Sequence, residues 1–192
     1  MAERQQRQVF ENSSLDHETE NSIRYAEGMS SPAVPLDVTL IQQESVRVYY
    51  HRYQGAFGPP LGRFWRDTVY PWMSRTGLTG QRRYGVALDD PMFTDEAKCR
   101  YDACVEVGAV PLLDETANVM NLPGGKCASV RFCGTSQEIV KTWDELLRSW
   151  LPASGFQLDA RPFMERYEPG HRVDEKTGTF ECDILIPVTR LL

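Results

Sequence analysis

The sequence has little of what metal-dependent, disulfide-linked or membrane-spanning proteins need. Its five cysteines form no C-x-x-C pair, and its three histidines lie far apart, none of them in an H-E-x-x-H pattern. No apolar run reaches the length of a signal peptide or a membrane span. We therefore expect reduced thiols, no metal, no cofactor, no membrane partner and a cytoplasmic location.

Signatures of covalent catalysis and of phosphate binding are also missing. The sequence has no G-x-S-x-G motif. The stretch Gly124-Gly125-Lys126 lacks both ends of a phosphate-binding loop, because Met120 stands five residues before Gly125 and Cys127 follows the lysine. We interpret this stretch as a turn.

The composition is that of a globular protein with an acidic surface. Hydrophobic residues make up 41% of the 192 residues and charged residues 25%, which is enough for a buried core. The net charge is -6, so the field of the whole molecule repels phosphate. Neither DNA nor an anionic membrane is an expected partner, whereas a cationic or neutral small molecule suits this field.

The first 36 residues differ in composition from the rest. They hold few large apolar side chains and end in a stretch rich in serine and proline. We interpret residues 1–36 as a polar tail or linker and residues 37–192 as one domain.

The domain contains an internal repeat, which covers the chain from about Val46 to Val188. Arg52-Tyr53-Gln54-Gly55 recurs 79 residues later as Arg131-Phe132-Cys133-Gly134, each time at the end of a strand-like run. Three further pairs are 78 residues apart: Trp65 and Trp143, Trp72 and Trp150, and Gly77 and Gly155. We therefore expect module one at about residues 37–110 and module two at about 122–189, linked by Asn121 to Gly125.

Each copy follows the same order of predicted elements. Apolar residues recur at helical spacing over 61–73 and 139–151, with a capping box from Thr135 to Glu138 and a bend at Pro71. Two strand-like runs follow each helix, at 83–88 and 101–107 in copy one and at 163–167 and 180–188 in copy two. The prediction is an α+β fold of two β-α-β-β modules, each with a helix across one face of an antiparallel sheet.

Aromatic side chains are concentrated on the predicted strands: Tyr49, Tyr50, Tyr53, Tyr84, Tyr101, Phe163, Tyr167 and Phe180. Because strands alternate their faces, Phe163, Glu165 and Tyr167 are expected to emerge on one side. Rings attract cations and flat apolar surfaces, and a partly desolvated carboxylate supplies the counter-charge. The alternative is that the rings pack in the core and Glu165 points into water, and the pattern alone leaves both open.

Two other groups of residues have ordinary structural explanations. Trp65 and Trp143 suit a helix that covers a sheet, although Trp65 remains a candidate for ligand contact. Asp102 and Glu106 alternate with apolar residues, as expected for a strand with one solvated face.

Five segments together resemble the GyrI-like small-molecule-binding domain, over roughly residues 37–189. They are Tyr101-Asp102-Ala103-Cys104-Val105-Glu106-Val107, Leu122-Pro123-Gly124-Gly125-Lys126, Trp150-Leu151-Pro152-Ala153-Ser154-Gly155-Phe156, Phe163-Met164-Glu165-Arg166-Tyr167 and Asp183-Ile184-Leu185-Ile186-Pro187-Val188. That domain is the effector-binding module of AraC-type and MerR-type multidrug regulators and also occurs alone. The resemblance implies a pseudo-twofold pair of modules whose antiparallel sheets form a concave ligand groove, with helices on the outer face.

The resemblance also implies a ligand and a site. In the drug-binding members of the family a buried glutamate on a late strand, surrounded by aromatic rings, faces cationic lipophilic ligands. Glu165 is the position that matches best, with Glu181 second. The ligand-binding candidates are Glu165, Phe163, Tyr167, Phe180, Tyr101, Tyr84, Tyr49 and Trp65.

Two alternatives to a stand-alone binding protein follow from the same resemblance. Some stand-alone members hydrolyse reactive cyclopropane-bearing toxins, and Glu165 with Tyr167 or Tyr101 would then act as acid or base. The family's naming member suggests instead a protein partner such as DNA gyrase. The family's regulators carry a helix-turn-helix region, whereas only an acidic-leaning tail precedes the domain here, so DNA contact is expected only through a separate DNA-binding regulator.

Overall fold

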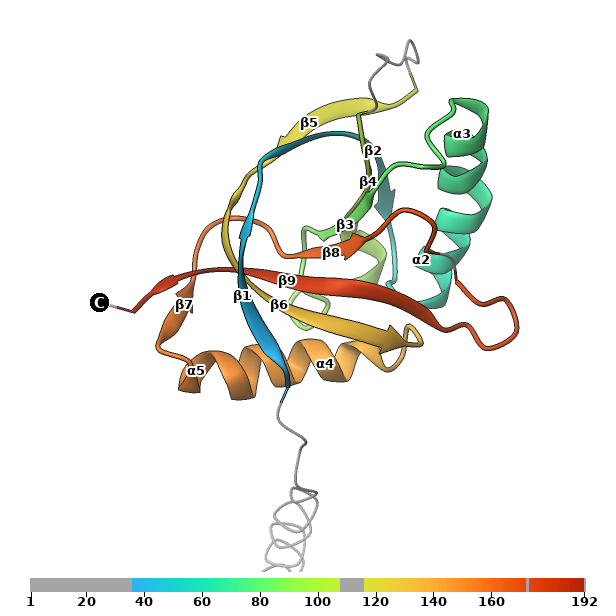
Figure 1. The fold of residues 1–192 in the computed structure, drawn as a ribbon. Helices are drawn as coiled ribbons and strands as arrows, with labels where there is room; N and C mark the ends of the chain where they lie inside the picture. Colours follow the sequence, from blue (N-terminus) through green and yellow to red (C-terminus); the bar gives the residue numbers. More distant parts are fainter. Residues whose placement is uncertain (1–35, 108–115, 172, 192) are drawn as a thin grey trace, which may run out of the picture. The chain divides into compact units, whose positions relative to one another are not determined.

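The computed structural model describes residues 36–107, 116–171 and 173–191, drawn in colour in Figure 1. These residues form an α+β fold with an antiparallel sheet of nine strands and two long, interrupted helices. The predicted tail, apart from Leu36, lies outside the described residues.

The elements follow the predicted order in both modules. Module one contains β1 (Val38–Gln43), β2 (Val46–Gln54), a helix built from α2 (Pro59–Phe64), η1 (Trp65–Val69) and α3 (Tyr70–Arg75), then β3 (Arg83–Ala87), η2 (Glu96–Lys98) and β4 (Arg100–Glu106). Module two contains β5 (Asn118–Leu122), β6 (Gly125–Gly134), a helix built from α4 (Ile139–Glu145), η3 (Leu146–Trp150) and α5 (Leu151–Ala153), then β7 (Phe156–Leu158), β8 (Met164–Tyr167) and β9 (Phe180–Arg190).

Each long helix contains a wide turn just before a proline. The Tyr70 N–H donates to the Trp65 carbonyl, and the Leu151 N–H donates to the Leu146 carbonyl, which is π-helical spacing. Pro71 and Pro152 follow directly. Since a proline ring crowds the preceding turn and cannot donate, a π turn at this place lets the helix continue past it.

The predicted capping box at the start of α4 is confirmed. The Thr135 N–H donates to a Glu138 carboxylate oxygen at 2.7 Å, and the Glu138 N–H donates to the Thr135 hydroxyl at 3.4 Å. The Glu138 N–H also donates to the Thr135 carbonyl at 3.1 Å, so the side chains reinforce the first turn that leads into the helix.

The sheet order places the two modules symmetrically. The strands run β1-β6-β9-β8-β3-β4-β2-β5, and β7 pairs with β9. At the centre β3 of module one pairs antiparallel with β8 of module two, so that Arg83 lies opposite Tyr167 and Gly85 opposite Glu165. The duplicated β-α-β-β arrangement is thereby confirmed.

The leading strand of each module pairs with the other module. Strand β1 pairs with β6, and β5 pairs with β2, in one unbroken register from Val38 opposite Val130 to Tyr50 opposite Asn118. Glu44 and Ser45 alone separate β1 from β2. This ladder joins the modules a second time, in addition to the β3–β8 pair.

The predicted link from Asn121 to Gly125 is mostly strand. Asn121 belongs to β5 and Gly125 to β6, which leaves only Pro123 and Gly124 between them. A Cβ atom on Gly124 would lie 2.5 Å from the Ser45 backbone nitrogen, so the two segments can approach this closely only because the residue is glycine.

The core has two sides, because successive strand residues face opposite ways. One side carries both helices: Trp72 and Val105 pack in a cluster under α2–α3, and Leu146 and Ile184 in one under α4–α5. The other side is a separate cluster of Val48, Tyr84, Val86, Cys104, Leu122, Cys127, Met164 and Leu185. The helix-bearing side therefore holds the odd-numbered residues of β3 and β8.

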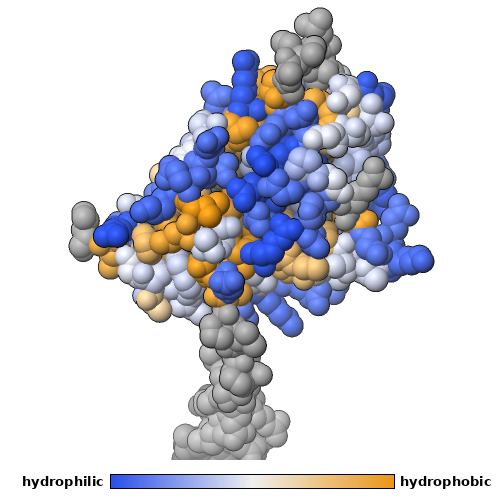
Figure 2. Space-filling view, viewed as in Figure 1, coloured by the Kyte–Doolittle hydropathy of each residue, from blue (hydrophilic) through white to orange (hydrophobic). Residues whose placement is uncertain are grey.

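On the face drawn in Figure 2, polar and apolar surface alternate, and apolar surface gathers over β1 and β7, the strands that carry the exposed Leu40 and Leu158.

Among the described residues no helix is long and apolar enough to cross a bilayer. All five cysteines are unpaired, and only Cys133 is exposed.

Candidate functional site

Glu165 lies in the middle of β8 with its carboxylate among aromatic side chains. One oxygen, Oε2, accepts two hydrogen bonds, from the Tyr101 hydroxyl at 3.0 Å and from the Tyr167 hydroxyl at 2.8 Å. Tyr101 comes from β4 of module one and Tyr167 from β8 of module two. The two modules therefore meet at this carboxylate.

Gly85 provides the space for this arrangement. It lies opposite Glu165 on β3, and a Cβ atom there would be 1.7 Å from the Tyr101 hydroxyl oxygen and 2.8 Å from Glu165 Oε2. A strand glycine commonly marks the close approach of another group. Here the groups that approach are the carboxylate and the tyrosine that donates to it.

The surroundings of Glu165 favour its protonated form. Burial raises the pKa of the Glu165 carboxyl, while hydrogen bonds from Tyr167, Tyr101 and the Trp143 indole act in the opposite direction. Yet Glu165 keeps some solvent-accessible surface, as do Tyr167 and Trp143. Burial in the protein therefore desolvates the carboxyl group, while the residue as a whole keeps contact with solvent.

The two tyrosines remain hydrogen-bond donors at neutral pH. Burial raises the pKa of Tyr101 and of Tyr167 well above the ordinary value, and the negative charge of Glu165 raises both further. Neither hydroxyl ionises under ordinary conditions.

Aromatic rings from module one surround one side of the carboxylate. The Trp65 ring centre lies 6.5 Å from that of Tyr101 and 6.1 Å from that of Tyr167. Phe57 meets Tyr101 edge to face at 5.9 Å. These separations are typical of favourable aromatic pairs.

Rings from module two also lie near the carboxylate. Trp143 stacks on Phe163, with centres 5.9 Å apart and planes 20° apart, and Phe180 lies 6.1 Å from Tyr167. Trp143 donates to the Glu165 carboxylate, and Trp65, 78 residues earlier in the sequence, packs against the two tyrosines that also donate to it.

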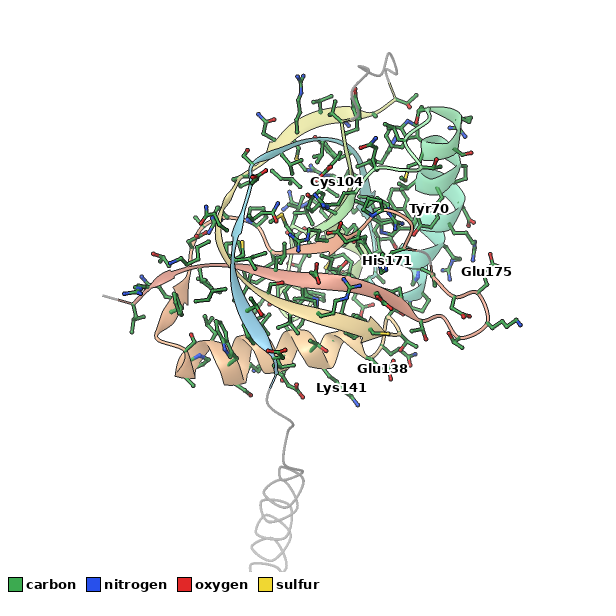
Figure 3. All side chains as sticks on the ribbon, in the orientation of Figure 1. Tyr70, Cys104, Glu138, Lys141, His171 and Glu175 are labelled. Atoms are coloured by element: carbon green, nitrogen blue, oxygen red, sulfur yellow. The ribbon has the colours of Figure 1, made fainter. Side chains whose placement is uncertain are left out.

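A buried arginine lies beside this cluster. Arg83 faces the same side of the sheet as Gly85, and its Nη1 donates to the Tyr70 hydroxyl at 2.9 Å while its Nη2 donates to the His171 carbonyl. Its guanidinium carbon lies 5.3 Å from the Tyr70 ring centre and 5.6 Å from that of Tyr167. Figure 3 labels Tyr70 and His171, the two residues that Arg83 bridges.

Five of the predicted ligand contacts, Phe163, Tyr167, Phe180, Tyr101 and Trp65, lie in or beside the cluster around Glu165. The remaining candidates lie elsewhere.

Tyr84 faces the opposite side of the sheet, fully buried, and its hydroxyl donates to Glu106 at 2.8 Å. Tyr49 packs under α2–α3 against Trp72. Glu181, the second choice of acid, is 45% exposed and pairs with Arg131.

Sequence reasoning missed four contributors: Trp143, Phe57, Gly85 and Arg83. Trp143 and Gly85 carried a signal, one through its partner Trp65 in the repeat and the other as a glycine within a strand. Phe57 and Arg83 carried none, because a loop phenylalanine and a strand-end arginine suit many environments.

A family model for the GyrI-like small molecule binding domain matches residues 36–189. The chain belongs to this family. This match confirms the expected family, and the similarity to a solved structure confirms the expected fold.

Two relatives and one solved structure illustrate the range of the GyrI-like family. The probable transcriptional regulator YgiV of Escherichia coli K12 is 32% identical over 161 residues, which cover 80% of this chain and 96% of that protein. A DNA gyrase inhibitor of Edwardsiella piscicida is 27% identical over 143 residues, which cover 72% of this chain and 89% of that protein. The C-terminal domain of EcmrR has a TM-score of 0.62 at 14% identity, over 81% of this chain and 99% of that one.

Proposed function

We propose that this GyrI-like domain binds an amphipathic small molecule, cationic or aromatic, against Glu165 at the junction of the two modules. The observation that carries the proposal is the Glu165 carboxylate itself, held by Tyr101 and Tyr167 and surrounded by rings from both helices. The family's description as a small-molecule-binding domain supports the class of function.

A cationic ligand would neutralise the charge of Glu165. No basic side chain of the described residues forms an ion pair with this carboxylate, and the only groups that stabilise its charge are hydroxyl and indole donors. Burying an unpaired carboxylate is costly. A cation that enters among the rings removes that cost and gains cation–π and stacking energy at the same time.

The test is titration with a fluorescent lipophilic cation such as rhodamine 6G. Glu165→Gln keeps the size of the side chain and removes its charge, so we expect affinity to fall by about 10-fold or more, the usual worth of one charge-assisted contact. Glu181→Gln is the matched control, since that acid is exposed and pairs with Arg131. Equal binding by wild type and Glu165→Gln, or no binding by wild type, contradicts the proposal.

The geometry also supports a hydrolase as a second candidate. A carboxyl with a raised pKa that accepts from two tyrosine hydroxyls could move a proton to or from a bound water or leaving group. Incubation with an electrophilic cyclopropane compound and mass spectrometry of the products tests this. An intact compound after long incubation removes the candidate, and Glu165→Gln and Tyr167→Phe identify the residues if the compound is opened.

A protein-binding role comes from the relatives alone. A relative at 27% identity is named a DNA gyrase inhibitor, and another at 32% identity is named a probable transcriptional regulator. Gyrase or a separate DNA-binding regulator therefore stays a predicted partner, and a supercoiling assay with the purified protein in molar excess over gyrase tests the first.

A further inference from the structure

Arg83 is a buried cation without an acidic partner. Only 6% of the residue is exposed, and its described contacts are the Tyr70 hydroxyl, the His171 carbonyl and the faces of two rings. No carboxylate of the described residues forms an ion pair with it. A guanidinium carries five N–H donors, so these two hydrogen bonds leave several donors for another acceptor.

A buried arginine without a carboxylate partner is unusual in this protein, as the three arginines of intermediate burial show. In the described part of the chain each of them pairs with a carboxylate: Arg82 with Glu168 at 3.0 Å, Arg161 with Asp159 at 2.5 Å and Arg166 with Asp183 at 2.9 Å. Arg83 is more deeply buried than all three and has no such partner. The missing counter-charge is the feature to explain, because a buried charge is normally paired.

Arg83 and Glu165 are neighbours on the same side of the sheet. Arg83 lies opposite Tyr167 on the β3–β8 pair, and Glu165 is two residues before Tyr167. Such diagonal neighbours are about 7–8 Å apart. A cation and an anion, each without an ion-pair partner, therefore lie within the span of one small molecule.

Tyr167 accounts for the failure of the two charges to pair with each other. Its hydroxyl donates to Glu165 Oε2, while its ring lies 5.6 Å from the Arg83 guanidinium carbon. The side chain thus contacts both groups and stands between them. A ligand that crosses the Tyr167 ring would reach Glu165 at one end and Arg83 at the other.

We propose that Arg83 is a second, anion-binding subsite and that the ligand is zwitterionic, with a cationic group at Glu165 and a carboxylate at Arg83. The inference rests on the proposed binding function and adds the second charge. A guanidinium is suited to this task because its planar N–H groups can bind a carboxylate in bidentate fashion. A ligand with a cationic group alone would satisfy Glu165 and leave Arg83 without a partner.

The experiment compares two dyes that differ only in the acid. Rhodamine B is a zwitterion with a free carboxylate, and its ethyl ester is a cation without one. We expect wild type to bind rhodamine B about 10-fold more tightly than the ester, as one charge-assisted contact provides. Arg83→Gln should abolish the preference for rhodamine B over its ester, whereas Glu165→Gln should weaken the binding of both dyes.

The outcomes separate this inference from the proposed function. If wild type binds the ester in a Glu165-dependent manner but does not prefer rhodamine B, only the zwitterion inference is wrong. If neither dye binds, the proposed function is wrong and the inference with it. The wild-type comparison needs no variant, so the inference stays testable even if Arg83→Gln does not fold, and Arg83→Lys, which keeps the charge but not the planar donors, should show an intermediate preference.

Discussion

Gly85 and Glu165 lie opposite each other on the two central strands, and the missing side chain of one makes room for the carboxylate of the other. They occupy corresponding strands of the two modules, β3 and β8. The repeat is therefore symmetric in its backbone and unequal in its chemistry. A second acid at position 85 would fill the space of the Tyr101 hydroxyl and place two like charges together.

Gly85→Ala adds only one methyl group but should lower both the stability of the protein and its affinity for a cationic dye. The new methyl group would overlap the Tyr101 hydroxyl, so we expect a loss of about 1–3 kcal/mol in the free energy of unfolding and at least a 10-fold loss of cationic dye affinity. Thermal denaturation and dye titration measure the two effects. Gly62→Ala is the control, because that exposed glycine in α2 has open space at its Cβ and should gain about 0.5–1 kcal/mol. Unchanged dye binding in Gly85→Ala would contradict the geometry described for Tyr101.

Cation binding should depend on pH through Glu165. Because burial raises the pKa of this carboxyl above 4.5, the charged form that attracts a cation is lost as the pH falls through that higher value. Dye affinity measured from pH 4 to 8 should therefore rise with pH and level off. Glu165→Gln should give a flat profile over the same range, and an equally sloped profile in that variant would assign the dependence to another group.

The stability of the ligand-free protein should also depend on the protonation of Glu165, but in the opposite direction to cation binding: the protonated form is the one that stabilises the fold. A carboxyl whose pKa is higher in the folded than in the unfolded state contributes stability below its unfolded pKa, and this contribution is lost as the pH rises through the folded pKa. The difference in unfolding free energy between Glu165→Gln and wild type should accordingly grow in favour of the variant as the pH rises above about 4.5. Urea denaturation at a series of pH values measures it.

Tyr167→Phe should raise the pKa of Glu165 further, since it removes one of the donors that stabilise the charged form. The midpoint of the pH profile for cation binding should move to higher pH, and affinity at neutral pH should fall several-fold. Tyr84→Phe is the matched control: that hydroxyl donates to Glu106 on the other side of the sheet. An equal midpoint shift in both variants would show that the effect is not local to Glu165.

Gly124→Ala tests the close approach of Gly124 to the backbone between β1 and β2. The added Cβ would meet backbone atoms of Ser45 and Gln43 at 2.5 and 2.8 Å, and backbone cannot rotate away as a side chain can. We expect a loss of about 1–3 kcal/mol or more in unfolding free energy, measured by urea denaturation. Gly80→Ala, with nothing near its Cβ, should be close to neutral, and equal losses of stability in the two variants would contradict the close approach at Gly124.

Much of the architecture could be predicted because characteristic residues recur at the same spacing in both modules. The spacing of Trp65 and Trp143 placed both helices correctly, and the predicted alternation put Glu165 and Tyr167 on one side of β8, where the Tyr167 hydroxyl donates to the carboxylate. Each helix and the alternation within β8 depend on residues close together in the chain, and the repeat shows the same local pattern twice. Local periodicity is the information that a single sequence expresses most directly.

What could not be predicted depends on residues far apart in the sequence. The alternation of β3 does not say which side the helices cover, so Tyr84 was expected with Glu165 although it lies on the other side of the sheet. The pairing of β1 with β6 involves partners about 90 residues apart, and nothing local in either strand specifies it. The burial of Arg83 and its lack of an acidic partner likewise depend on residues that are distant in the sequence.

The exchange of leading strands gives the two repeats the bonding pattern of a domain-swapped dimer fused into one chain. Each repeat supplies a strand that completes the other's half of the sheet, so cutting the chain between them would leave β2 without β5 and β6 without β1. We therefore expect a single cooperative unfolding transition rather than two. A half-molecule that lacks either repeat would expose an unpaired strand edge, prone to association with a second copy.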